Sequence, residues 1–108
     1  MGRNSKDNSL TRYTELVKIS IRYNDYLKHP IKLGFASRSN REVAQAVKYV
    51  NNVKRTLKKL KKEDKNIIMK EFFAYKRDPF WWEKHYSKST YYRRRYFAVK
   101  SFMEIYAQ

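Results

Sequence analysis

The stretch W-W-E-K-H-Y-S-K-S-T-Y-Y-R-R-R-Y-F-A-V-K-S-F, residues 81–102, decides the fold that we expect. Its middle, S-K-S-T, is rich in helix-capping side chains, and a basic, aromatic run follows. Within that run Tyr91, Ala98 and Phe102 recur at helical spacing, so they share one face. The stretch therefore predicts a last helix that begins at residue 88 or 89 and runs to about residue 107.

The residues just before this helix predict a shorter one. Asp78 followed by Pro79 is typical of a helix N-cap and first turn, which predicts a short helix over residues 79–85. A short helix, a tight turn and a longer basic helix follow one another in a helix-turn-helix, whose second helix enters the DNA major groove. Ala98 would then let a neighbouring helix approach closely.

Three further helices are predicted upstream, each from a local signal. The first covers residues 9–28, because the residue before Pro30 is disfavoured in a helix. The second begins at Ser39, which stands three residues before Glu42 as in a capping box. The third covers residues 63–76 and opens on two acids.

The sequence thus predicts an all-α fold of about five helices. Residues 1–38 would form an N-terminal helix, capped by Ser9, and a linker, whereas residues 39–108 would form the helix-turn-helix bundle. We expect these parts to form one compact domain. The buried stripe of the second helix is predicted to consist of Val43, Val47, Val50, Val53 or Lys54, Leu57 and Leu60.

Two segments resemble region four of bacterial sigma factors. L-K-K-L-K-K-E-D-K-N-I-I-M-K-E-F-F at residues 57–73 resembles the opening of that region, and residues 81–102 resemble its helix-turn-helix. In this alignment the family's buried branched residue corresponds to Tyr91, its near-invariant alanine to Ala98 and its terminal leucine to Phe102. The chain departs from the family where F-W-W-E-K replaces the usual Glu-Ile-Ala triplet, and where the common glycine of the turn is absent.

The string S-K-S-T-Y-Y-R-R-R more closely resembles the ArpU and RinA type late transcription regulators of phages of low-GC Gram-positive bacteria, and related small proteins of mollicutes. The resemblance implies a sequence-specific DNA-binding transcription regulator, or a partial sigma-like factor that acts with RNA polymerase. Double-stranded DNA is the partner that it implies.

The charge also favours a polyanionic partner. The 108 residues include 26 Lys and Arg against 10 Asp and Glu, a formal net charge of +16. Residues 1–53 carry 10 basic and 4 acidic groups, and residues 54–108 carry 16 and 6. Bound nucleic acid relieves the self-repulsion of such a chain. An RNA-binding or ribosome-associated protein, or a module that docks on RNA polymerase, remains an alternative, and the oligomeric state stays open.

The predicted contact residues fall into two groups. The groove-facing group consists of Lys88, Ser89, Tyr92, Arg93 and Tyr96. The group that contacts backbone phosphates consists of Lys58, Lys59, Lys61, Lys62 and Arg95. The three arginines at 93–95 point in three directions around a helix, so we expect one to face the body of the domain and two to face DNA. The lysine run also has a structural explanation, because cations stabilise a helix C-terminus.

The pattern of an enzyme is missing. The chain has no cysteine and no Gly-rich phosphate loop, and His29 and His85 lack partners at the spacing of a metal site or a triad. We therefore predict no enzymatic activity, no metal and no cofactor. The lack of cysteine and of a long apolar run favours a cytoplasmic protein that does not span a membrane. Core packing and a stacking platform for single-stranded nucleic acid both explain Trp81 and Trp82.

Overall fold

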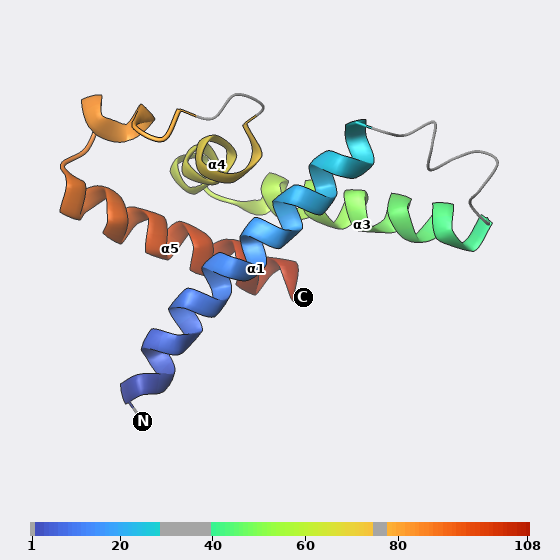
Figure 1. Cartoon of the computed structure of the whole chain (residues 1–108), viewed down its shortest axis with the longest axis horizontal. Coiled ribbons are helices and arrows are strands. Elements are labelled where there is room, and N and C mark those ends of the chain that lie inside the picture. The colour runs from blue at the N-terminus through green and yellow to red at the C-terminus, as the bar shows by residue number, and fades with distance from the viewer. Residues whose placement is uncertain (1, 29–39, 75–77) are drawn as a thin grey trace.

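The computed structural model describes residues 2–28, 40–74 and 78–108, with side chains from residue 9 onward. Helices make up nearly all of this described part, and no strand occurs in it. In chain order they are α1 (Gly2–Lys28), α3 (Asn40–Lys59), α4 (Lys62–Ile68), the π-helical turn η1 (Met69–Phe73), the 3-10 turn η2 (Trp81–Lys84) and α5 (Lys88–Tyr106) (Figure 1). The prediction of an all-α fold is confirmed.

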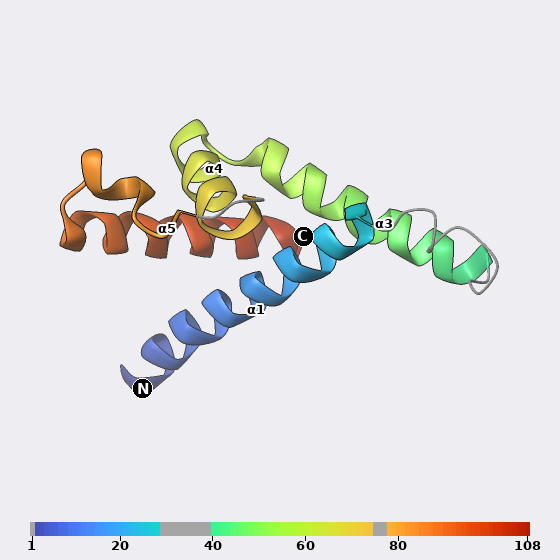
Figure 2. The same ribbon diagram turned by 45° about the horizontal axis from the view of Figure 1, so that its top comes forward.

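The last helix, α5, is the central element of the bundle. α1, α3 and α4 each pack against it, and η1 continues α4 and contacts α1. α1 crosses α5, and the N-terminus of α1 projects away from the other helices in both views (Figures 1 and 2). The described part is elongated and thin, with extents of 49 × 36 × 21 Å.

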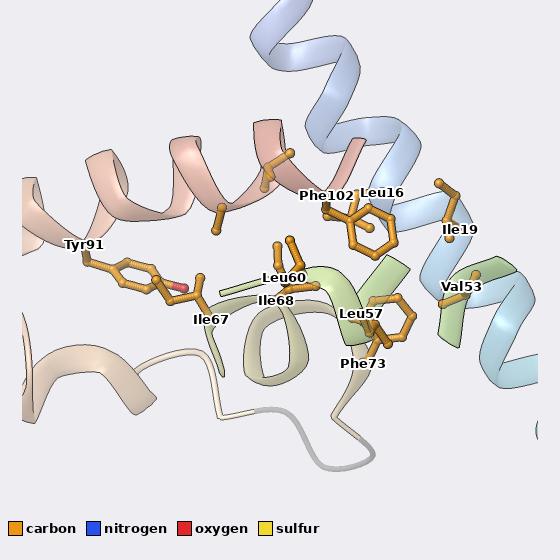
Figure 3. Packing of buried hydrophobic residues seen from close by; sticks show 12 residues of the cluster. Leu16, Ile19, Val53, Leu57, Leu60, Ile67, Ile68, Phe73, Tyr91 and Phe102 are labelled. Carbon is orange, nitrogen blue, oxygen red and sulfur yellow. The ribbon is translucent and has the colours of Figure 1, made fainter. Parts of the chain in front are cut away.

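The hydrophobic core forms where these helices meet α5 (Figure 3). Its largest fully buried apolar or aromatic side chains are Leu16, Val53, Ile67, Ile68, Tyr91 and Phe102. Ala98 is also fully buried, as its position on the α5 face predicts. Its small side chain lets the neighbouring helices come close to α5.

Two helices differ from the sequence prediction in their start or their buried face. α1 begins at Gly2, so the predicted start at Ser9 is wrong; residues 2–8 contain no proline, and a helix extends readily from turns that are already packed. In α3, Val47 is 54% exposed, whereas Ala46 and Val53 are buried. Val43 and Val50 are half-buried, and Val53, Leu57 and Leu60 are buried as predicted. Val47 is exposed in the first half of α3, which projects beyond α5 (Figure 1).

The segment between α4 and α5 also differs from the prediction. The third helix ends at Phe73, and residues 75–77 lie outside the described part, as do the predicted linker and Ser39. The short helix expected over residues 79–85 is a single 3-10 turn. Its bonds span three residues, from the amides of Trp81, Glu83 and His85 to the carbonyls of Asp78, Phe80 and Trp82.

The side chain of Trp82 explains why η2 adopts the narrower 3-10 geometry. The indole Nε1 of Trp82 donates to the carbonyl of Pro79 at 3.0 Å, and its ring stacks on Tyr91 with the centroids 4.8 Å apart. The indole thus folds the turn back onto the start of α5. The short helix predicted over residues 79–85 is therefore replaced by one turn of 3-10 helix.

Candidate nucleic-acid interface

Four lysines surround the junction of α3 and α4, which we call the basic corner: Lys58, Lys59, Lys61 and Lys62. All four are exposed. Leu60, in the middle of the corner, is 8% exposed and belongs to the core. The buried leucine anchors the junction, so the flanking lysines are held at the surface.

The start of α5 is fixed by a local cap. The hydroxyl of Ser87 accepts from the backbone amide of Thr90 at 3.3 Å and donates to the Thr90 hydroxyl at 2.9 Å. The prediction that the last helix begins at residue 88 or 89 is confirmed, since α5 begins at Lys88. The side chains of Lys88, Ser89 and Arg93 are exposed on its first two turns, and we call these three residues the α5 face.

Glu63 connects the basic corner to the start of α5. Its Oε2 accepts from the hydroxyl of Tyr86 at 3.1 Å, and its Oε1 accepts from the guanidinium of Arg94, also at 3.1 Å. Burial and the bond to Glu63 raise the pKa of Tyr86, which keeps this hydroxyl a donor. The two predicted contact groups, far apart in sequence, therefore lie on neighbouring elements.

The cations of this region are largely uncompensated. Within the described part of the chain, no carboxylate oxygen lies within 4.0 Å of the amino or guanidinium groups of the basic corner or the α5 face. Arg94 and Arg95, in contrast, are paired with Glu63 and Glu71. Asp64 is close enough to feel the charge of Lys61 but forms no salt bridge with it. Within the described residues, the surface thus presents six cations that form no salt bridge: Lys58, Lys59, Lys61, Lys62, Lys88 and Arg93.

Two of the predicted groove-facing residues, Tyr92 and Tyr96, also border a cleft. Tyr92 and Tyr96, 42% and 36% exposed, line a cleft of about 670 Å³ between α1 and α5. The other lining residues are Ser9, Leu10, Arg12, Tyr13, Arg95 and Val99. The guanidinium of Arg12 lies 5.9 Å from the centre of the Tyr96 ring. The predicted groove-facing set therefore borders this aromatic cleft, and its two tyrosines contribute to the cleft lining.

Arg95, predicted to contact a phosphate, points into the fold. Its guanidinium lies 3.6 Å from Oε2 of Glu71, which is 4% exposed. The same guanidinium stacks against the rings of Tyr13 and Tyr92, each at 4.7 Å. Because a buried carboxylate needs a partner for its charge, the pairing with Glu71 explains why the guanidinium of Arg95 turns toward the core. Arg95 is the arginine of the three that turns back toward the body of the domain.

Glu71 is a polar centre that the sequence prediction missed. Its Oε1 accepts from the hydroxyl of Tyr91 at 2.7 Å, and Oε2 accepts from the hydroxyl of Tyr13 at 3.4 Å. Burial and the bond to Glu71 raise the pKa of Tyr91 well above its ordinary value. The sequence contains one signal for such a buried acid, the three consecutive arginines at 93–95. One of these arginines must face the bundle, and its charge then needs an acidic partner there.

The two tryptophans pack against the fold. The ring of Trp82 stacks on Tyr91, and that of Trp81 meets Tyr91 edge-on at 5.5 Å. Lys70 lies over the ring of Trp81 at 5.1 Å. Both indoles are partly buried, whereas the neighbouring Phe80 is 60% exposed. The packing explanation thus accounts for both tryptophans.

The comparisons with known proteins do not narrow the function. The chain matches no protein-family model, no curated protein and no solved structure. Over the described ranges, no helix is long and apolar enough to cross a membrane. Among those same residues, no three His, Asp or Glu side chains come together as ligands for a metal ion.

Proposed function

We propose that the protein is a sequence-specific DNA-binding transcription regulator that reads duplex DNA with the first half of α5. The observation that carries this proposal is the uncompensated charge of the α5 face beside the basic corner. Both surfaces are exposed, and Glu63 joins the elements that bear them. The domain thus presents a capped helix end and a row of lysines on neighbouring elements.

The two surfaces suit two kinds of contact. The major groove of B-DNA accommodates an α-helix, and groove-reading side chains come from the first turns of that helix. Arg93 can donate two parallel bonds to O6 and N7 of guanine. The lysines of the basic corner can neutralise phosphates but carry no sequence information. The net charge of +16 supplies the long-range attraction to the polyanion.

The resemblance to sigma region four supports a role in transcription. It covers residues 57–73 and 81–102, which contain the basic corner and the α5 face. A partial sigma-like factor that contacts RNA polymerase is the same proposal in a more specific form. The 3-10 turn η2 stands where the resemblance implies the first helix of the pair.

The cleft between α1 and α5 favours a second candidate, an RNA-binding or ribosome-associated protein. Tyr92 and Tyr96 offer partly exposed rings, and the cations of Arg95 and Arg12 lie over them respectively. Aromatic rings next to cations bind unpaired bases without regard to sequence. Binding of this kind would depend on the cleft and not on the α5 face.

Selection of binding sites from random duplexes tests the proposal, followed by titrations of the selected site, a random duplex and a structured RNA. Six uncompensated cations predict a salt slope of about −5, at roughly −0.9 per neutralised phosphate. Arg93→Ala should weaken the selected site by about 5- to 100-fold more than the random duplex. Lys59→Ala should weaken both equally and flatten the slope by about one unit.

Lys48→Ala is the matched control, because it removes one exposed cation of α3 outside the basic corner. It should alter each affinity less than Lys59→Ala does. The proposal fails if Arg93→Ala weakens the selected and random duplexes by the same factor. If RNA competes better than duplex at equal salt, and Tyr96→Ala abolishes that preference, the second candidate replaces the first.

A further inference from the structure

We propose that Glu63 and Glu71 select Arg93 as the DNA-reading arginine by withdrawing Arg94 and Arg95 from the DNA. The inference rests on the proposed function and assigns two positioning residues to its site. Neither carboxylate lies on α5: Glu63 belongs to the first turn of α4 and Glu71 to η1.

The geometry of α5 makes such a selection necessary. Consecutive residues of an α-helix are rotated by about 100°, so three arginines in a row spread over more than half of its circumference. Arg95 reaches the 4%-exposed carboxylate of Glu71 and is itself 26% exposed. The guanidinium of Arg95 therefore lies at the edge of the core, against the rings of Tyr13 and Tyr92.

Arg94 is withheld in a different way. Its side chain is 54% exposed and bridges to Glu63, whose side chain is 43% exposed, across the junction of α4 and α5. The solvent screens such a bridge, so its strength alone would not bury the cation. Instead, the carboxylate of Glu63 accepts a hydrogen bond from the guanidinium of Arg94, and its negative charge repels an approaching phosphate. Arg94 becomes available for DNA when the charge of Glu63 is removed.

The consequence for recognition is weaker binding to DNA of arbitrary sequence. A free arginine beside Arg93 would add affinity for any phosphate, which raises binding to every sequence equally. Random duplex would then be bound at protein concentrations at which the parent leaves it unbound. By neutralising Arg94, Glu63 keeps the contribution of sequence-independent contacts low.

Glu63→Gln tests the inference, because it removes the charge and keeps the size of the side chain. Binding to random duplex should strengthen several-fold, and the salt slope should become steeper by about 0.9. Glu104→Gln is the matched control: it causes the same change in net charge from an exposed position near the far end of α5. Glu104→Gln should change both the affinity for random duplex and the salt slope less than Glu63→Gln does.

Arg94→Gln in two backgrounds makes the test specific. In the parent, the slope should remain unchanged, because Arg94 contacts no phosphate. In Glu63→Gln, the same substitution should reverse the gain. Arg95→Gln should lower the melting temperature without flattening the salt slope, since its partner is buried. Circular dichroism establishes that each variant is folded before it is titrated.

Two results would overturn the inference while leaving the proposed function in place. One is a flattening of the slope by about one unit for Arg94→Gln or folded Arg95→Gln in the parent background. The other is equal behaviour of Glu63→Gln and Glu104→Gln. Failure of the parent to bind duplex, in contrast, would overturn the proposed function and this inference together.

Discussion

Tyr91→Phe should destabilise the fold far more than the loss of one oxygen atom suggests. Tyr91 is 1% exposed, and its hydroxyl donates a hydrogen bond to Oε1 of Glu71 at 2.7 Å. Glu71 is 4% exposed, so water cannot readily replace the lost donor. The substitution keeps the ring, which stacks on Trp82. The measured loss therefore reports the hydrogen bond and not the aromatic packing.

The expected magnitude follows from the charge of the acceptor. A hydrogen bond to a charged group contributes about 1.5–3 kcal/mol to the free energy of unfolding. In a domain of this size 1 kcal/mol shifts the melting temperature by about 4 °C, so Tyr91→Phe should melt about 6–12 °C below the parent.

Thermal unfolding at neutral pH, followed by circular dichroism at 222 nm, measures this shift. Tyr92→Phe is the matched control, because it removes a hydroxyl from the adjacent residue, which is 42% exposed. The control should melt within about 2 °C of the parent. If Tyr91→Phe also melts within that range, the hydroxyl does not stabilise Glu71, and the account of the polar centre is refuted.

Two further predictions concern packing and pH. Ala98→Leu adds three carbon atoms at a fully buried site, which should lower the free energy of unfolding by about 1–3 kcal/mol. Urea denaturation measures this loss, and a midpoint equal to that of the parent would contradict the placement of α5. Burial raises the pKa of Tyr23 and Tyr91 in the folded state above 10.0, the value for an unperturbed tyrosine. The contribution of these two hydroxyls to the free energy of unfolding is therefore complete below pH about 10, and it is lost as the pH rises from there toward the folded pKa. The melting temperature should fall from pH 10 to 12, less steeply in Tyr91→Phe, and a flat profile would contradict the raised pKa values.

Features that depend on neighbouring residues could be predicted from the sequence. The start of α5 is one, because Ser87 caps an amide only three positions further along the chain. The burial of Ala98 and Phe102 is another, since their spacing with Tyr91 places all three on one helical face. The exposure of the lysines in the basic corner follows from their charge, which is costly to bury unpaired.

Features that depend on residues far apart in the sequence could not be predicted from it. The form of η2 is set by the Trp82 ring on Tyr91, a contact that no capping pattern around Pro79 contains. The position of α1 sends Tyr92 and Tyr96 toward a cleft, although their place on the helix equally suited the DNA groove.

The three arginines show the division most clearly. Their sequence determined that they point in three directions, because a helix rotates by about 100° per residue. Which of them stays free was decided by Glu63 and Glu71, 31 and 24 positions before their partners. Side chains so far apart meet only when α4 and η1 pack on α5, and that packing depends on the shared core rather than on any local preference.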